Sequence, residues 1–411
     1  MAEGVLFVHT NFPAQFRDLV ESLLARGVPV RAISANTAPV MPQVRTARYG
    51  LSRGTTPGIF VYAVRPEADL LRATAALRGA RSLKAEGFEP QVIVGHSGWG
   101  ETALLKEAWP DAKQVLYPEF FYRGRGLDID FDNEFIPLTE EGVLLGKTKN
   151  SVMSLALTDA TAIVCPTPFQ ASTLPSIFQP RVRVIHEGID VDAIAPAPAA
   201  PFPLDDGRVI APGTPVITHI NNQMEPLRGL HIFLRALPRV LEAVPDAQVL
   251  VIGDEKARGY GGNAPEGKTW KQVCLEGVED RIDMSRVHFL GRVAHGRMHD
   301  ALRLSSAHVY YTYPFVLSWS LAEAMALGCY VIGSDTPPVR DAIEDGMNGR
   351  LLPFFDVDAL SEALIEACRN PEATRPLRAA ARETPLERFS RAKGRQAWLD
   401  LLREMDVEIP A

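Results

Sequence analysis

Polar residues that could bind or activate a ligand follow directly after the first apolar run of the chain. This run extends from Gly4 to Val8, and His9, Asn11 and Gln15 come after it. A short apolar run followed by an amphipathic helix predicts a buried parallel strand. In open α/β sheets, ligands bind at the carboxyl ends of the strands. The three side chains are therefore candidates for a binding site.

A histidine stands in the corresponding place after another apolar run. His96 follows the predicted strand Gln91 to Gly95, and Gly98 and Gly100 come shortly after it. Glycine has no Cβ, so it allows the backbone to come close to a neighbouring group. We therefore count His96 as a candidate catalytic residue and Gly98 as a candidate binding position. A loop histidine with structural partners only is the alternative.

The stretch from Tyr310 to Gly333 predicts a loop, a short helix and a buried strand. Ser320 and Glu323 fit a capping box, with the serine as N-cap and the glutamate three residues later. Gly328 stands where such a helix ends. The unpaired N–H groups at a helix N-terminus attract anions, which makes this start a candidate phosphate site. Comparable helix starts occur in every α/β protein, and most bind nothing.

The elements that must position these residues recur in both halves of the chain. The first half predicts a helix from Ala14 to Arg26 and a strand from Val28 to Ile33. The second half restarts with a strand from Pro215 to Ile220 and a helix from Leu230 to Val244. Two such series predict an α/β protein with two doubly wound, Rossmann-like domains facing across a cleft. We predict domains at 1–192 and 208–392, an Ala/Pro-rich hinge at 193–207, and a C-terminal helix at about 393–411 that packs back on the first domain.

Composition narrows the class of protein. The 411 residues carry a net charge of −7, which argues against general nucleic-acid binding. The four cysteines are isolated from one another, so buried free thiols in a reducing compartment are expected. The chain starts without a basic, apolar leader, and no stretch has the length of a membrane span. We expect a cytoplasmic protein, with contact at the inner membrane face left open.

Charge is unevenly distributed along the chain. Residues 1–84 hold eleven Lys and Arg against five Asp and Glu, a net charge of +6. This basic portion could meet an anionic acceptor or a lipid surface, although a solvated basic face without a partner is the commoner explanation.

Two other motifs carry less weight. The alternating carboxylates Asp128, Asp130 and Asp132 resemble a divalent-metal site, but no glycine-turned ligand loop accompanies them, and we predict no metal. The Gly-rich segment from Tyr260 to Gly267 indicates surface flexibility, because no strand leads directly into it and no helix begins with it.

With these motifs in order, the chain resembles the retaining glycosyltransferases of family 4 (group 1), which have the GT-B fold. The motifs P-L-R-G, P-D-A-Q-V-L-V-I-G-D, V-H-F-L-G-R-V and L-A-E-A-M-A-L-G-C-Y-V-I-G-S-D carry the resemblance in the second half. The first half resembles a bacterial subgroup with an N-F-P-x-Q-F loop. The resemblance implies transfer of a hexose-type sugar from a UDP- or GDP-linked donor to a glycan, lipid-linked or protein acceptor. It implies no cofactor and no metal.

The resemblance also assigns roles to positions of this chain. Arg228 would neutralise the donor diphosphate, and Glu323 would bond the nucleotide ribose. Backbone N–H groups of Ser318 and Trp319 would hold the diphosphate. The remaining donor-site positions are the main chain at Arg292 and Val293 for the nucleobase, with Asn222, Gly253, Leu317 and Ser320. His96, Gly98 and the loop from Asn11 to Gln15 would close over the sugar.

Two positions depart from the family pattern. Phe315 stands where the family has a glutamate that reads the donor sugar, and Asn222 stands closest to an expected arginine. These departures favour one competing hypothesis, a catalytically weak GT-B scaffold or binding subunit. A nicotinamide-dependent oxidoreductase is a further alternative, but the chain lacks the G-x-G-x-x-G fingerprint after its first strand.

Overall fold

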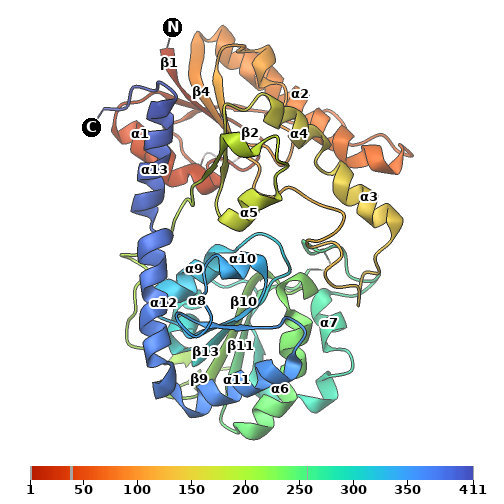
Figure 1. Ribbon diagram of the computed structural model, residues 1–411, viewed down its shortest axis with the longest axis vertical. Coiled ribbons are helices and arrows are strands. Elements are labelled where there is room, and N and C mark those ends of the chain that lie inside the picture. The colour runs from red at the N-terminus through yellow and green to blue at the C-terminus, as the bar shows by residue number, and fades with distance from the viewer. Residues whose placement is uncertain (1, 38–39, 257, 411) are drawn as a thin grey trace. The chain divides into compact units, whose positions relative to one another are not determined.

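The chain divides into two compact units in the computed structural model, which describes residues 2–37, 40–256 and 258–410. The first unit comprises the chain up to Asn133, Pro137–Gly188 and the segment from Arg391 onward. The second comprises Glu134–Ile136 and Ile189–Ser390. Each unit holds a parallel sheet with helices on its faces (Figure 1).

The first unit contains a seven-stranded sheet in the order β3-β2-β1-β4-β5-β6-β7, with all neighbours parallel. Its strands are β1 (Ala2–Val8), β2 (Val30–Ser34), β3 (Arg45–Arg48), β4 (Phe88–His96), β5 (Lys113–Tyr117), β6 (Ala162–Cys165) and β7 (Val182–Val184). In β1, Val5 and Phe7 enter one core, whereas Leu6 and Val8 enter another. Because both faces of the sheet are covered, its central strands contain uninterrupted apolar runs, such as Val5–Val8 in β1 and Val92–Val94 in β4.

Helices of the first unit follow these strands. They are η1 (Ala14–Phe16), α1 (Arg17–Ala25), η2 (Val61–Ala63), α2 (Val64–Ala85), η3 (Leu105–Glu107), α3 (Glu140–Thr148), α4 (Ser151–Thr158), α5 (Pro168–Thr173), η4 (Gln179–Arg181) and α13 (Arg391–Glu404). Helix α13 lies beside α1, and the ring centroids of Trp398 and Phe16 are 6.0 Å apart (Figure 1). The end of the chain thus contributes to the first core.

The second unit contains a six-stranded parallel sheet in the order β12-β11-β10-β13-β14-β15. Its strands are β10 (Val216–Gln223), β11 (Gln248–Asp254), β12 (Val287–Phe289), β13 (Ala307–Tyr310), β14 (Val331–Ser334) and β15 (Arg350–Leu352), and a small antiparallel pair joins β8 (Phe202–Pro203) to β9 (Val209–Ile210). Its helices are η5 (Pro226–Arg228), α6 (Leu230–Ala243), α7 (Trp270–Leu275), η6 (Glu279–Arg281), η7 (Met284–Arg286), α8 (His295–Leu304), α9 (Trp319–Ala326), α10 (Pro337–Arg340), α11 (Val357–Arg369), η8 (Pro371–Thr374) and α12 (Arg375–Arg388). The strand order 3-2-1-4-5-6 is that of a doubly wound fold.

The Ala/Pro-rich segment differs from the predicted hinge. Here the change between units lies between Gly188 and Ile189, ahead of the segment. Ile194, Phe202 and Leu204 of the segment are buried in the core of the second unit. The apolar side chains that interrupt the Ala/Pro run therefore hold it against this core.

Three segments of the first unit have a local structure that a simple hydrophobic pattern does not reveal. The stretch between β4 and β5 is a series of turns with the short helix η3 in it. Residues 140–158 form two helices, α3 and α4, and Asn150 between them bonds the backbone of Tyr122 at 2.9 and 2.7 Å. The edge strand β3 is too short and too polar to give an apolar pattern.

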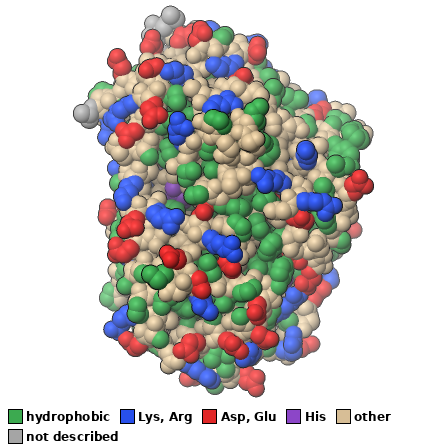
Figure 2. All heavy atoms as spheres, in the orientation of Figure 1, with side chains coloured by type: hydrophobic (Ala, Val, Ile, Leu, Met, Phe, Trp, Pro, Cys, Tyr) green, Lys and Arg blue, Asp and Glu red, His purple; other side chains and the backbone are tan. Residues whose placement is uncertain are grey.

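The cysteines, the helices and the surface charges bear on the compartment and on membrane contact. All four cysteines are free and buried, as predicted. Among the described residues, none of the helices has the length and apolar character needed to cross a membrane. Lys and Arg side chains are interspersed with Asp and Glu on the face shown in Figure 2, so the basic residues visible there do not gather in one patch.

Candidate functional site

Each sheet has one place where neighbouring strands lead to helices on opposite faces. In the first unit this place is between β1 and β4, and in the second it is between β10 and β13. Ligands of open α/β sheets bind at the carboxyl ends of the strands at such points. The predicted residues follow these strand ends: His9 and His96 in the first unit, Arg228 and the loop before α9 in the second.

Arg228 is a buried cation at the end of η5, with 5% of its surface exposed. Its guanidinium donates hydrogen bonds to Thr312 Oγ1 at 2.9 Å and to the carbonyl oxygen of Val316 at 3.1 Å. The next residue, Gly229, has φ of +72°, and a Cβ there would lie 2.4 Å from Tyr311 Cβ. Only glycine fits this turn, which fixes Arg228 against the loop after β13.

Two aromatic rings cover the Arg228 guanidinium. The carbon at its centre lies 5.7 Å from the ring centroid of Phe315 and 6.0 Å from that of Tyr260. The two rings are themselves 5.9 Å apart. A ring face attracts a cation, so these contacts stabilise charged Arg228 where the family pattern has a sugar-reading glutamate.

The Gly-rich loop around Tyr260 is packed rather than flexible, which corrects the sequence-based interpretation. Gly261 N–H donates to the buried carboxylate of Glu225 at 3.0 Å. A Cβ on Gly259 would lie 2.0 Å from Glu225 Oε2, and one on Gly261 would lie 3.3 Å from Leu227 Cβ. These glycines let the loop approach η5 and place Tyr260 beside Arg228.

Asn222 and Arg292, predicted separately, meet in the structure. Arg292 donates to Asn222 Oδ1 at 2.6 Å, and Asn222 Nδ2 donates to the Tyr260 hydroxyl at 3.0 Å. Arg292 also lies 3.4 Å from the carboxylate of Asp254 at the end of β11. Arg292 therefore supplies a positive charge close to the position where the family pattern has its missing arginine.

The start of α9 differs from the predicted capping box. Ser318, not Ser320, is the N-cap, and its hydroxyl accepts from Ser320 N–H at 3.3 Å. Ser318 N–H itself donates to the Tyr310 hydroxyl at 2.7 Å. Glu323 lies in the middle of the helix rather than at its third position, so its carboxylate does not cap the helix. A diphosphate held by Ser318 N–H would have to displace the Tyr310 hydroxyl, while the neighbouring amide of Trp319 stays a predicted contact.

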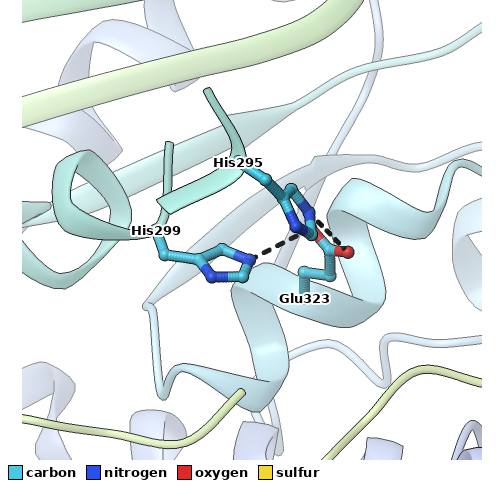
Figure 3. A group of neighbouring side chains, drawn as sticks. All are labelled: His295, His299 and Glu323. Atoms are coloured by element: carbon cyan, nitrogen blue, oxygen red, sulfur yellow. Dashed lines mark hydrogen bonds and ion pairs between the residues drawn. The ribbon is translucent and has the colours of Figure 1, made fainter. Parts of the chain in front are cut away.

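Glu323 is buried and faces two histidines (Figure 3). His295 Nε2 lies 3.0 Å from both carboxylate oxygens, and His299 Nε2 lies 3.4 Å from Oε2. His295 and His299 stand one helical turn apart in α8, and their side chains point towards α9 (Figure 3). The sequence analysis missed both histidines, although the spacing H-x-x-x-H in His295–His299 was a usable signal.

The other predicted positions of the second unit are structural in character. A Cβ on Gly253 would lie 2.7 Å from the carbonyl oxygen of Asn221, so the strand end requires glycine. Gly253 N–H donates to the carbonyl oxygen of Gly291, next to Arg292, at 3.0 Å. Val293 and Leu317 are half-buried and pack against the core. Their contacts with a donor remain predictions.

In the first unit, His96 lies among aromatic rings at the end of β4. Its ring centroid is 4.5 Å from Trp99 and 5.9 Å from Tyr117. Gly98 N–H donates to His96 Nδ1 at 3.2 Å, so a neutral ring carries its proton on Nε2, which lies 3.5 Å from the carboxylate of Glu119. A Cβ on Gly98 would lie 2.7 Å from the His96 ring, which explains the glycine.

His9 packs edge-on against His96, with ring centroids 5.2 Å apart. Asn11 N–H donates to His9 Nδ1 at 2.8 Å. Burial, together with the nearby His96, lowers the pKa of His9 to about 3, although a hydrogen bond between His9 and the Gln15 side chain opposes this shift. Burial thus keeps His9 neutral, and the structure brings His9, Asn11, Gln15 and His96 together.

A buried carboxylate behind His9 was not predicted. Glu101 accepts hydrogen bonds from the Thr10 hydroxyl and, at 2.7 Å, from the Tyr49 hydroxyl. Burial raises the pKa of Tyr49, and the Glu101 charge raises it further. The motif H-S-G-W-G-E-T contains this glutamate, but its burial depends on Tyr49, which is distant in sequence.

Comparison with known proteins gives the family. Residues 26–194 match the Glycosyl transferase family 4 group, and residues 214–370 match Glycosyl transferases group 1. The chain belongs to these glycosyltransferases. The family predicted from the motifs is confirmed, whereas the retaining stereochemistry and the bacterial subgroup stay predictions.

Relatives and solved structures extend this result. Over 194 residues the chain is 31% identical to a phosphatidyl-myo-inositol mannosyltransferase of Mycobacterium leprae, covering 45% of this chain and 44% of that protein. It is 22% identical over 355 residues to a D-inositol 3-phosphate glycosyltransferase of Saccharomonospora viridis, covering 79% of each. The match with the mannosyltransferase therefore spans less than half the length of that relative.

Two solved structures show the fold. Sucrose-phosphate synthase from Thermosynechococcus elongatus superposes with a TM-score of 0.70 at 18% identity, covering 98% of this chain and 99% of that chain. Anabaena Alr3699/HepE in complex with UDP and glucose gives 0.65 at 14% identity, covering 98% and 100%. The predicted GT-B fold with two Rossmann-like domains is confirmed.

Proposed function

We propose that the protein is a retaining glycosyltransferase that moves a hexose-type sugar from a nucleotide-sugar donor to an acceptor hydroxyl, without a metal cofactor. The observation that carries this proposal is the buried guanidinium of Arg228 beside the loop that leads into α9. Arg228 would hold the donor diphosphate, assisted by Arg292 and by amides at the start of α9.

The chemistry needs a fixed positive charge at this place. When the bond between the anomeric carbon and the diphosphate oxygen breaks, negative charge builds on the leaving diphosphate. A preorganised cation stabilises that charge more strongly in the transition state than in the ground state. Arg228 is held in place by Thr312 and Val316, so it requires little reorganisation during the reaction.

The anomeric configuration of the sugar is retained if the acceptor hydroxyl attacks the anomeric carbon from the same face that the diphosphate leaves. A new bond forms between the acceptor oxygen and the anomeric carbon, and the hydroxyl proton passes to the departing phosphate oxygen. This route needs no carboxylate nucleophile. Glu225, a carboxylate close enough to interact with Arg228, accepts a hydrogen bond from Gly261 N–H. We infer that Glu323 bonds the ribose, and that His96 contacts the sugar or the acceptor.

The names of the relatives narrow the substrates. One acts on phosphatidyl-myo-inositol and another on D-inositol 3-phosphate, and one solved structure holds UDP and glucose. We infer a UDP- or GDP-linked donor and a hydroxyl acceptor on a phosphorylated polyol, a lipid-linked intermediate, a glycan or a protein. A cytoplasmic location, with contact at a membrane surface for a lipid acceptor, fits this proposal.

A nucleotide-binding screen tests the proposal. Thermal unfolding is followed with UDP, GDP and their hexose conjugates, in EDTA. A ligand at 100 times its dissociation constant should stabilise the protein by about 2.7 kcal/mol. Product formed with a responding donor is then analysed for anomeric configuration by proton NMR, where an unchanged configuration is expected.

The competing outcome is a scaffold. Phe315 in place of the sugar-reading glutamate favours that hypothesis, because a phenyl ring accepts no hydrogen bond from a sugar hydroxyl. Nucleotide binding with no hydrolysis and no transfer to any acceptor extract would support the scaffold and contradict the transferase. Transfer with inversion would contradict the retaining route only.

A further inference from the structure

We propose that His295, His299 and Glu323 form a binding site for a divalent transition metal of the Zn²⁺ type, and that a bound metal inhibits the protein by withdrawing Glu323 from the nucleotide. The metal site rests on the geometry of the three side chains alone. The inhibition also rests on the proposed role of Glu323 in binding the ribose.

The distances fit a metal as well as they fit a hydrogen bond. His295 Nε2 lies 3.0 Å from each Glu323 oxygen, and His299 Nε2 lies 3.4 Å from Oε2. One ligand atom from each residue lies within 4.8 Å of the others. In a tetrahedral zinc site with bonds of about 2.0–2.2 Å, neighbouring ligand atoms are about 3.3 Å apart. Small side-chain adjustments would therefore place a metal between the three groups.

Two helices hold these ligands rigidly. His295 and His299 are four residues apart, which places them on one face of α8, and their ring centroids are 4.3 Å apart. Glu323 comes from the middle of α9, and its carboxylate faces both rings (Figure 3). Two imidazoles and a carboxylate are a ligand set that zinc accepts.

Exposure gives the site an entry path. The side chain of His295 is 62% exposed, whereas those of His299 and Glu323 are 11% and 8% exposed. A metal can thus arrive from solvent at His295 and be held by the two inner ligands. Three protein ligands leave a coordination position for water.

Metal binding and ribose binding compete for the same carboxylate. Both oxygens of Glu323 already face His295, so a metal there would occupy the lone pairs that ribose hydroxyls need. The site would therefore make donor binding sensitive to free transition metal.

A zinc titration tests whether the metal site exists. Protein without an affinity tag is titrated with Zn²⁺ in the presence of a competing chelator at pH 7.5, and one site is expected. His295→Asn and the double variant His295→Asn/His299→Asn should weaken it at least tenfold. His288→Asn is the matched control, since His288 is a half-buried histidine of the same unit bonded to Gln248 at 2.9 Å.

Thermal unfolding without metal verifies that each variant is folded. The exposed His295→Asn variant keeps the test decisive if replacement of the more buried His299 prevents folding. Equal zinc affinity in His295→Asn and the natural protein, or an equal loss in His288→Asn, would overturn the site.

The inhibition is tested by measuring nucleotide binding with and without zinc. UDP and GDP affinities are measured in EDTA and at a free Zn²⁺ concentration that a chelator buffers against scavenging by phosphate. We expect at least a tenfold loss of affinity with zinc in the natural protein and none in His295→Asn/His299→Asn. Zinc binding with unchanged nucleotide affinity would overturn the inhibition. If no nucleotide binds even in EDTA, the proposed function fails, whereas the zinc titration still decides the metal site.

Discussion

The two units place different charges at equivalent points of the same fold. In the first, burial lowers the pKa of His9 to about 3, so that this residue is neutral at the strand end beside His96. In the second, Arg228 is equally buried and keeps its charge among hydrogen-bond acceptors and ring faces. The fold thus determines that a ligand binds at a strand end. The side chains at that strand end determine whether the binding site is charged or neutral.

The difference suggests a division of tasks. A fixed cation suits a diphosphate whose negative charge grows during the reaction. Neutral imidazoles suit uncharged hydroxyls, to which they can donate or from which they can accept a hydrogen bond. Each of the following predictions alters one side of this comparison.

Replacing the cation of the second unit should have the largest effect. Arg228→Met keeps much of the side-chain volume but removes the charge, and we expect the transfer rate to fall about 10²–10³-fold. Arg239→Met is the matched control, because Arg239 is a surface arginine of α6 paired with Asp358 and Glu362. Steady-state kinetics measure both. A fall of less than threefold in Arg228→Met would remove Arg228 from the site.

Removing the His96 ring of the first unit should affect transfer but not nucleotide binding. We expect His96→Gln to lower kcat/KM by about 10²-fold, as the loss of a positioned proton-transfer or hydrogen-bonding group does. Calorimetry should find UDP or GDP affinity unchanged, because the nucleotide is assigned to the second unit. An equal loss of nucleotide affinity would contradict the division of tasks.

Glu323→Gln should weaken nucleotide binding selectively. A hydrogen bond to a charged group contributes about 1.5–3 kcal/mol, so a loss of at least about tenfold is expected. Inorganic pyrophosphate, which lacks a ribose, should bind the variant and the natural protein equally. If pyrophosphate loses as much affinity as UDP or GDP, Glu323 acts on the phosphates or on the fold instead.

Acid should destabilise both units through their buried histidines. The pKa is lowered to about 3 in His9 and His308 and to about 4 in His219, mainly by burial. Below pH 6.5, the pKa of histidine in the unfolded chain, the unfolded chain binds protons that the folded chain does not. The free energy of unfolding therefore decreases as the pH is lowered from 6.5 to about 3–4. Each group contributes up to about 1.4 kcal/mol per pH unit.

The smallest effect is expected when one of these three histidines, His9, is replaced. His9→Gln should make the pH dependence of the unfolding midpoint shallower between pH 6.5 and pH 5, while leaving the contribution of His219 and His308. Thermal unfolding at several pH values measures it. An unchanged slope would show that His9 is not held neutral in the folded protein.

Sequence reasoning recovered the architecture because that architecture depends on local patterns. The apolar runs of β1, β4, β10 and β11 mark central strands that are buried on both faces, and the Gly residues after helices mark turns. Strand β3 escaped prediction because Arg45 and Arg48 are exposed at the sheet edge, where no apolar pattern is required. The α9 cap was misplaced because Ser318 and Ser320 are both acceptable N-caps, and only the backbone distinguishes them.

The site was predictable where a motif is continuous and hidden where it is assembled from distant segments. Arg228 follows from P-L-R-G, but its cover by Tyr260 depends on a loop whose glycines permit close packing against Glu225. Likewise, Glu323 was found within its helix, whereas its pairing with His295 requires knowing that α8 and α9 are neighbours. Contacts between segments far apart in sequence are set by tertiary packing, which a local pattern does not encode.

The return of the chain to the first unit at Arg391 has a consequence for biosynthesis. A nascent polypeptide leaves the ribosome from its N-terminus, and domains generally fold as they emerge. Here the second unit has its complete sequence once Ser390 has been made, whereas the first core still lacks Trp398 and Leu402 of α13. The first unit therefore waits for a segment that is synthesised after the second unit, and premature termination near residue 390 would leave the earlier-made unit, rather than the later one, exposed to quality control.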